Sequence, residues 1–185
     1  MRIIGGDLRG KRLASVGKGD AGAHLRPTTD RVRESIFNVI TNAYGNPIPE
    51  ARVLDLFAGT GALGLEALSR GAARASFVEN GRTSLRILRD NIALCRMEDR
   101  ATVLQRDFKR LGQNADAPYD LIFLDPPYGK AMGEAALTLA LAGGWIAEDA
   151  LIVWEEAAEC LPPEGITLLD VRRYGDTAVH FAERG

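Results

Sequence analysis

From residue 52 to residue 154, short apolar segments typical of buried strands alternate with segments that have the apolar periodicity of helices. The expected strands are 52–57, 75–78, 102–105, 121–124 and 151–154, and the expected helices are 62–69, 83–94 and 134–142. This alternation predicts a parallel sheet with helices on both faces. The final expected strands, 166–172 and 178–181, are joined by a short turn and must be antiparallel. We therefore predict an α/β fold with a mostly parallel seven-stranded sheet and a C-terminal antiparallel hairpin.

The first 45 residues have a different character. Six glycines among the first 25 residues predict a hairpin or a loop. Apolar residues at helical spacing between Val32 and Ala43 predict a helix that Gly45 and Pro47 end. We interpret residues 1–45 as a small β-hairpin and helix extension, and residues 46–185 as the main domain. A chain of 185 residues suits one well-cored domain with such an extension.

Charge is distributed unevenly along the chain. The net charge is −2, but residues 1–33 hold eight Lys or Arg against three Asp or Glu, a net charge of +5, and the remainder carries −7. A basic lobe beside an acidic body would contact phosphates on one face only. A solvated basic tail explains the same charge equally well.

Other features argue against several classes of protein. The sequence has no run of 18 apolar residues and no signal-like segment over residues 1–6, so we expect a cytoplasmic protein without membrane association. Cys95 and Cys160 lie far apart and outside any CxxC pattern, which indicates neither a disulfide framework nor a zinc site. The two histidines, His24 and His180, are also distant in sequence, and we predict no metal.

A glycine-rich loop joins the first expected strand to the helix after it. Gly59-Thr60-Gly61-Ala62-Leu63-Gly64 reads as GxGxxG, which permits a tight turn and close approach of a ligand at a helix N-terminus. Glu79 lies 20 residues beyond Gly59, where an acid that binds ribose hydroxyls is expected. The pattern indicates a nucleoside-containing cofactor, and a dinucleotide is the first candidate. A purely structural strand-to-helix turn is the alternative.

Two further acids favour a different cofactor. Asp55 lies inside the apolar strand before the glycine loop, and Asp107 follows the third expected strand. Together with Glu79 they predict a pocket ringed by carboxylates at the C-terminal edge of the sheet. Such a pocket repels a pyrophosphate and attracts a ligand with an ammonium and a sulfonium. S-adenosylmethionine therefore fits this charge better than NAD.

The tetrapeptide Asp125-Pro126-Pro127-Tyr128 ends the fourth expected strand at the same edge. Prolines fix φ and remove backbone donors, so the segment offers a carboxylate and a carbonyl as acceptors in rigid geometry. Acceptors of this kind bind an amino group, and the ring of Tyr128 could stack on a planar base. A strand cap followed by a simple turn is the alternative, although a turn requires neither the acid nor the tyrosine.

These motifs resemble a known class of enzymes. The segments LDLFAGTGALGLEAL, VEN, QRDF and YDLIFLDPPY resemble the Rossmann-like class I S-adenosylmethionine-dependent amino-methyltransferases. The segments MRIIGGDLRGKRL and LRPTTDRVRESIFNVI resemble the bacterial RsmD family of 16S rRNA guanine-N2 methyltransferases. The resemblance extends over nearly the whole chain.

The resemblance implies roles for individual residues. It assigns cofactor binding to Asp55, Gly59, Gly61, Glu79 and Asp107, and catalysis to Asp125, Pro126, Pro127 and Tyr128. It assigns rRNA contacts to Arg9, Lys11, Arg12, Arg26, Arg31 and Arg33. The implied partner is 16S rRNA within the small ribosomal subunit or an assembly intermediate, and the implied enzyme is a monomer. The target guanine would be unpaired or flipped out.

Four alternatives explain less of the sequence. A DNA adenine-N6 methyltransferase shares the tetrapeptide but usually needs a larger target-recognition region than 45 residues. A glutamine-N5 methyltransferase typically has Asn in place of Asp125 and a helical N-terminal domain. An NAD-dependent oxidoreductase leaves the tetrapeptide unexplained. A non-catalytic RNA-binding module would have a defective cofactor loop, whereas the loop at Gly59 is intact.

Overall fold

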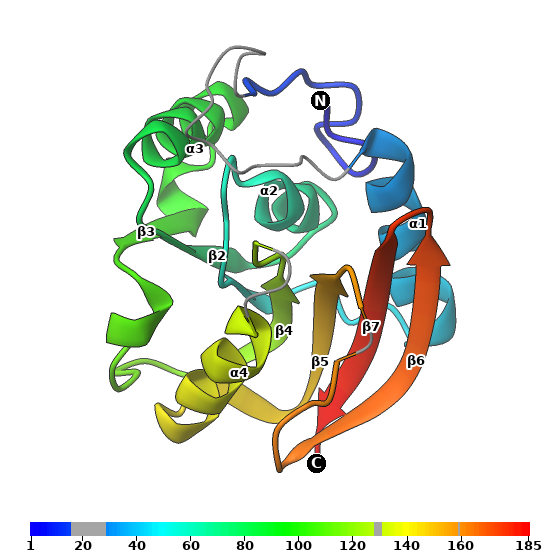
Figure 1. Ribbon diagram of the computed structural model, residues 1–185. Coiled ribbons are helices and arrows are strands. Elements are labelled where there is room, and N and C mark those ends of the chain that lie inside the picture. The colour runs from blue at the N-terminus through cyan, green and yellow to red at the C-terminus, as the bar shows by residue number, and fades with distance from the viewer. Residues whose placement is uncertain (16–28, 128–130, 159) are drawn as a thin grey trace.

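A computed structural model describes residues 1–15, 29–127, 131–158 and 160–185, and in them a seven-stranded sheet of order β3-β2-β1-β4-β5-β7-β6 (Figure 1). The strands are β1 (Arg52–Asp55), β2 (Arg74–Glu79), β3 (Ala101–Gln105), β4 (Tyr119–Leu124), β5 (Ile146–Glu156), β6 (Ile166–Tyr174) and β7 (Thr177–Arg184). The helices are α1 (Asp30–Ala43), α2 (Ala62–Ser69), α3 (Arg82–Cys95) and α4 (Met132–Ala142), with 3-10 turns η1 (Glu98–Arg100) and η2 (Phe108–Arg110). Strands β1 to β5 pair in parallel, and β7 is antiparallel to both β5 and β6. The predicted fold class is confirmed.

The main difference in element bounds concerns β5, which begins at Ile146 and not at residue 151. Its first half contains the polar residues Glu148 and Asp149, which interrupt the apolar pattern by which a buried strand is predicted. Asp149 has a positive φ of 59°, and the register between β4 and β5 shifts at this level. The irregularity accommodates exposed acids within a strand that is otherwise buried.

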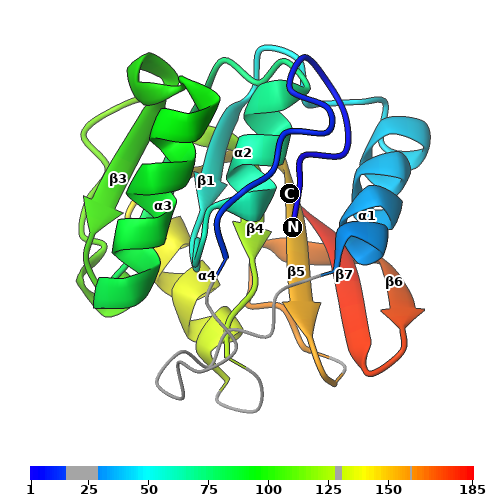
Figure 2. The same cartoon turned by 90° about the horizontal axis from the view of Figure 1, so that it is seen from above.

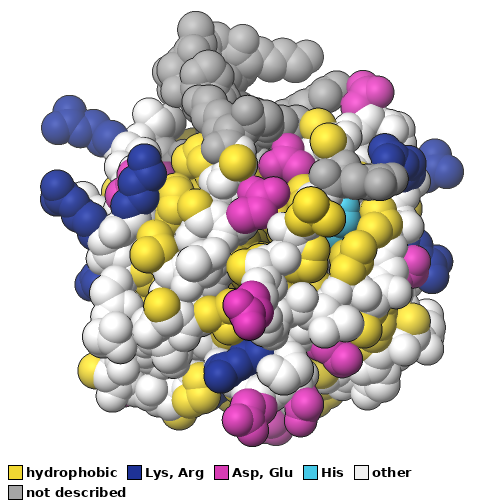
Figure 3. All heavy atoms as spheres, turned by 60° about the horizontal axis from the view of Figure 1, so that its bottom comes forward, with side chains coloured by type: hydrophobic (Ala, Val, Ile, Leu, Met, Phe, Trp, Pro, Cys, Tyr) yellow, Lys and Arg dark blue, Asp and Glu magenta, His cyan; other side chains and the backbone are white. Residues whose placement is uncertain are grey.

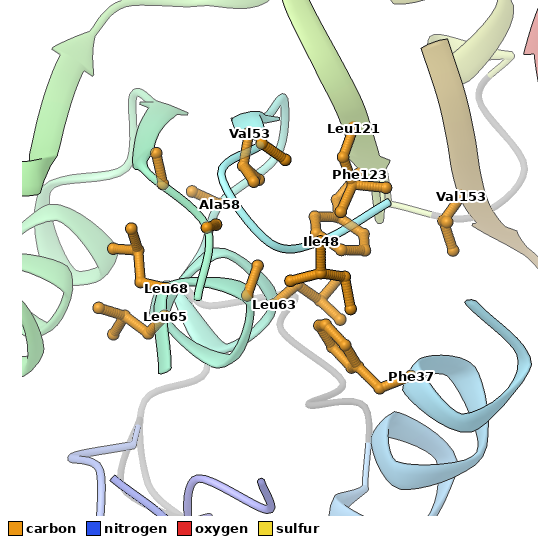
Figure 4. Close-up of a cluster of buried hydrophobic side chains, with 14 of the residues drawn as sticks. Phe37, Ile48, Val53, Ala58, Leu63, Leu65, Leu68, Leu121, Phe123 and Val153 are labelled. Carbon is orange, nitrogen blue, oxygen red and sulfur yellow. The ribbon is translucent and has the colours of Figure 1, made fainter. Parts of the chain in front are cut away.

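Alternate residues of the central strands face two separate hydrophobic cores. Val53 of β1 packs on the face covered by α1, α2 and α3, and Leu54 packs on the face covered by α4. Figure 2 shows α1, α2 and α3 on one face of the sheet and α4 on the other. Figure 4 shows Phe37 of α1 pointing toward Phe123 of β4 in the first core, where their ring centroids lie 5.7 Å apart. These two layers of helices hold the strand ends in fixed positions.

The N-terminal segment, residues 1–15, lies over α2 between α1 and α3 (Figures 1 and 2). It forms one isolated antiparallel bridge between Arg2 and Arg12, which is less than the predicted β-hairpin. Ile3 and Leu13 are buried in the same core as the strands. The segment therefore packs as part of the main hydrophobic core.

Buried polar groups of α2 attach this segment. The Glu66 carboxylate is fully buried and accepts hydrogen bonds from the backbone N–H groups of Ile4 and Gly5, both at 2.8 Å, and from Arg70 Nε at 2.7 Å. Ser69 Oγ accepts from the N–H of Leu8 at 3.0 Å. A buried carboxylate is tolerated only with such partners, so the segment and Glu66 depend on each other.

Replacing Glu66 with glutamine is expected to lower the free energy of unfolding by about 3 kcal/mol. The amide NH₂ would face one of the donors that now bind the carboxylate, so two donors would meet in a buried site. Urea unfolding measures the loss. Trypsin cleavage after Arg9 and Lys11, which are both exposed, should accelerate as the segment detaches.

Glu34→Gln is the matched control, because Glu34 is exposed on α1 and makes no comparable buried contact among the described residues. It should leave both the stability and the cleavage rate unchanged. Equal stability of Glu66→Gln and the wild type would show that the carboxylate does not hold the segment.

Candidate active site

The C-terminal ends of four adjacent strands bring the predicted acids to one edge of the sheet. Asp55 ends β1, Glu79 ends β2, Asp107 follows β3 and Asp125 follows β4. The order β3-β2-β1-β4 makes these strands consecutive neighbours. The connection after β1 leads to α2 on one face of the sheet, and the connection after β4 leads to α4 on the other face. This divergence creates the crevice between β1 and β4 where open α/β sheets bind ligands.

The carboxylate of Glu79 shapes the glycine loop. Its Oε2 accepts from the backbone N–H of Gly59 at 2.8 Å, and its Oε1 accepts from the N–H groups of Asn80 and Gly81 at 2.9 and 2.6 Å. A carboxylate has about four lone-pair positions, so one acceptor position remains on Oε2. Glu79 is half-buried and can offer that position to a ligand hydroxyl.

Asp107 lies beside this group. Its Oδ2 accepts from Asn80 Nδ2 at 3.1 Å, and its Oδ1 accepts from the N–H of Lys109 at 2.9 Å, which caps η2. The predicted pair of Glu79 and Asp107 is thus bridged by Asn80. Asn80 was not predicted as a site residue, although its place directly after the strand end at Glu79 was an available signal.

The glycines of the loop are required by its geometry. Gly59 and Gly61 have positive φ values of 54° and 84°, and Gly61 caps the N-terminus of α2. A Cβ at Gly61 would lie 2.5 Å from Leu88 Cδ1, and one at Gly64 would lie 2.4 Å from a carbon of the Phe77 ring. The loop therefore keeps its backbone close to the strand ends, with the N–H groups of a helix N-terminus facing the crevice.

Asp55 is a buried acid whose carboxylate is only partly hydrogen-bonded. It is 1% exposed, and its Oδ2 accepts from the N–H of Gly64 at 3.3 Å, whereas its Oδ1 has no hydrogen-bond partner among the described residues. Burial is the main cause that raises the pKa of Asp55 to about 7, and the charges of Asp125 and Glu79 act in the same direction, against the lowering effect of the backbone N–H groups of Gly64 and Phe57. An orphaned, buried carboxylate oxygen of this kind is suited to a cationic ligand group.

The tetrapeptide continues from β4 into the same crevice. Asp55 pairs in register with Phe123, so Asp125 follows two residues beyond the strand position opposite Asp55. Asp125 and Pro127 are half-buried, and Pro126 is buried. Tyr128 lies outside the described residues. The acid and the prolines therefore lie next to the end of β1 with Asp55, and the end of β2 with Glu79 is one strand further along the sheet.

The predicted RNA-contacting residues divide into three groups. Arg9, Lys11, Arg12 and Arg31 are exposed. Arg26 lies outside the described residues. Arg33 is only 1% exposed, which contradicts its predicted place on the RNA-binding surface.

The position of Arg33 has a physical reason. Its Nη2 donates to Asp30 Oδ1 at 2.8 Å and to the carbonyl of Arg2, so it joins α1 to the N-terminal segment. Residues 33, 36, 37 and 40 share one helical face, and Ile36 and Phe37 are fully buried. This spacing could have identified Arg33 as a buried residue from the sequence.

Asn91 of α3 is a further residue that sequence reasoning missed. It is fully buried, and its Nδ2 donates to the carbonyls of Thr60 and Ala14 at 2.9 and 3.1 Å. Its Oδ1 accepts from the N–H of Ala14 at 2.7 Å. Asn91 thus ties the glycine loop to the N-terminal segment. A polar residue on the apolar face of an amphipathic helix was the signal.

Two kinds of structural feature are absent from residues 1–15, 29–127, 131–158 and 160–185. No helix in them is long and apolar enough to cross a membrane. No group of three or more His, Cys, Asp or Glu side chains in them could hold a metal ion. Cys95 and Cys160 are buried free thiols.

The fold and the strand-end site define a class I methyltransferase. A protein-family model with the description "Conserved hypothetical protein 95" matches residues 1–183. Ribosomal RNA small subunit methyltransferase D of Escherichia coli (strain K12) is 40% identical over 159 residues, which cover 86% of this chain and 76% of that protein. The chain therefore belongs to the RsmD family.

Other relatives extend the similarity over the whole chain. YlbH of Bacillus subtilis is 38% identical over 192 residues, covering all of both proteins. The solved structure of yhhF from Escherichia coli has a TM-score of 0.83 and 34% identity, and it covers 100% of this chain and 97% of that chain. The N-terminal segment and the sheet thus have counterparts in one related protein.

Proposed function

We propose that this methyltransferase transfers a methyl group from S-adenosylmethionine to the exocyclic N2 amine of a guanine in 16S rRNA. The observation that carries the proposal is the Asp125-Pro126-Pro127 segment at the end of β4, beside the carboxylates of Asp55 and Glu79. The name of the Escherichia coli relative, a small-subunit rRNA methyltransferase, supports the substrate class.

The residues at the strand ends fit this cofactor. The orphaned Oδ1 of Asp55 suits the ammonium group, and the remaining acceptor position on Glu79 Oε2 suits a ribose hydroxyl. Asp107, bridged to this site by Asn80, would lie on the adenine side. Four carboxylates would repel the pyrophosphate of NAD, which argues against a dehydrogenase. When bound, S-adenosylmethionine supplies an electrophilic methyl group on a sulfonium.

The tetrapeptide acts on the amine that accepts the methyl group. An exocyclic amine on an aromatic base is a poor nucleophile because its lone pair is delocalised into the ring. The Asp125 carboxylate and the Pro126 carbonyl would accept its two N–H bonds and so favour a pyramidal nitrogen with a directed lone pair. The carboxylate also stabilises positive charge that develops on this nitrogen. Tyr128 is proposed to stack on the base.

Basic side chains near the N-terminus would bind the RNA backbone. Arg9, Lys11, Arg12 and Arg31 are exposed, and we keep Arg26 in this proposed set because the sequence alone supports it. The base edge inside an RNA duplex is hard to reach, so the guanine should be unpaired or flipped at a cost of a few kcal/mol. Such a substrate places the enzyme in the cytoplasm, and we propose that it acts as a monomer.

A methylation assay with three substrates tests the function. Labelled S-adenosylmethionine is incubated with small ribosomal subunits that lack the modification, with free 16S rRNA, and with duplex DNA. We expect label in rRNA alone, and N2-methylguanosine in the nucleoside digest. Label in DNA would support the DNA adenine alternative, and failure to bind S-adenosylmethionine in calorimetry would contradict the proposed cofactor.

A further inference from the structure

The charge of the molecule differs between the two ends of its sheet. Residues 82–110, which include α3, β3 and η2, hold eight Lys or Arg and four Asp or Glu, a net charge of +4. Residues 111–185, which include β4 to β7, hold four Lys or Arg and 13 Asp or Glu, a net charge of −9. A polyanion is therefore attracted to the β3 end and repelled from the β6 end.

Exposed cations flank the β3 edge of the sheet, from α3 on one face and from η2 on the other. Arg82, Arg86 and Arg89 are spaced so that they share one face of α3, and the opposite face packs into the core through residues such as Leu88. Arg89 Nη2 donates to Gln105 Oε1 of β3 at 2.8 Å, which places this face beside β3. Lys109 and Arg110 of η2 follow β3 directly. We call these five cations the β3-edge basic surface.

The cations of this surface are available to a ligand. Within the described part of the chain, the side chains of Arg82 and Arg110 make no hydrogen bond or ion pair, and both are exposed. Arg86 lies 3.9 Å from Asp90, with side chains 71% and 55% exposed, which is a weak pair in water. Figure 3 shows Lys and Arg side chains projecting at the left, on the side where Figure 1 has β3, and others at the right edge, while acidic side chains lie across the middle.

The surface begins where the cofactor crevice ends. Arg82 follows three residues after Glu79, and Lys109 follows two residues after Asp107. From β4, which carries the amine-binding segment, the sheet extends over β1 and β2 to β3. Three strand spacings amount to about 14 Å, a distance of a few nucleotides along a nucleic-acid strand.

We propose that the β3-edge basic surface binds phosphates of the rRNA strand that flanks the target guanine. The inference rests on the proposed function and adds a direction to it: the RNA leaves the crevice across α3 and η2, away from β6. Cations at the β6 end are poorer candidates, because Arg172 Nε is paired with Asp170 at 2.8 Å in an acidic region.

The test is a pair of double variants with equal loss of charge. Arg82→Gln/Arg86→Gln removes two cations of the β3-edge basic surface, and Arg172→Gln/Arg173→Gln removes two at the β6 end. Binding of a 16S rRNA fragment is measured at several salt concentrations, together with methylation and with affinity for S-adenosylmethionine. The first variant should bind the fragment roughly tenfold more weakly at 0.1 M salt, with a log–log salt slope shallower by about 1.5. The second should match the wild type.

The outcomes separate this inference from the proposed function. If the wild type methylates rRNA and both double variants bind it with the wild-type slope, the inference is wrong and the function stands. If Arg82→Gln/Arg86→Gln loses activity on whole subunits but binds and methylates free rRNA normally, the surface contacts a ribosomal protein, which also overturns the inference. If the wild type methylates no RNA, the proposed function itself fails.

Discussion

Replacing Asp125 with alanine is expected to reduce the rate of methyl transfer by about 10²- to 10³-fold. The change removes one of two proposed acceptors for the amine and the charge that stabilises the nitrogen as it becomes positive. The glycine loop, Glu79 and Asp107 make their contacts without Asp125, so affinity for S-adenosylmethionine should stay within severalfold of the wild-type value. Single-turnover kinetics with labelled cofactor measure the rate, and calorimetry measures the affinity.

Asp125→Asn is the informative control because asparagine keeps an acceptor oxygen but has no charge. A rate between those of the alanine variant and the wild type would assign the difference to charge. A nearly wild-type rate would assign the role of Asp125 to positioning alone. An undiminished rate in Asp125→Ala would remove the tetrapeptide from the proposed mechanism.

Asp55 should make the stability of the protein depend on pH. Burial raises the pKa of Asp55 to about 7 in the folded protein, whereas an unfolded aspartate titrates near 3.8. Between these values the folded state binds more protons, so the free energy of unfolding falls as pH rises from about 4 to 7. The full effect is at most about 4 kcal/mol. In Asp55→Asn this contribution disappears, and urea unfolding at pH 5 to 8 should show a flatter dependence.

The same group should couple cofactor binding to a proton. An ammonium beside Asp55 favours its carboxylate, so binding below pH 7 requires release of the proton, and affinity for S-adenosylmethionine should rise with pH up to about 7. Calorimetry in two buffers of different ionisation enthalpy counts the protons. Asp55→Asn should bind more weakly and release none. Wild-type affinity that is constant from pH 5 to 8 would contradict the proposed contact.

The sequence predicted those features that depend on local pattern. Strands appear as apolar runs, and the acids at positions 55, 79, 107 and 125 were placed correctly at one edge because each follows or ends such a run. Parallel strands have their C-terminal ends at the same edge of the sheet. The shared location of these acids could therefore be predicted without knowing any contact between distant segments. The early start of β5 at Ile146 was missed because Glu148 and Asp149 interrupt the apolar pattern.

Features that depend on contacts between distant segments were not predicted. Glu66 lies in a helix whose other residues are nearly all buried, and its partners at Ile4 and Gly5 are more than 60 residues away. Asn91 reaches Ala14 across 77 residues. Arg33 was assigned to the RNA-binding surface by the family resemblance, but its helical position indicated the core.

The bonds of Glu66 bear on how substrate choice can change in evolution. The N-terminal segment, with its exposed cations, supplies two of the three donors that satisfy this buried carboxylate in the helix following the glycine loop. Exchanging that segment for one without these two donors would leave buried acceptor positions of Glu66 unsatisfied, with the Arg70 ion pair as its remaining described contact. Changes in the N-terminal segment and changes around Glu66 are therefore expected to occur together in evolution.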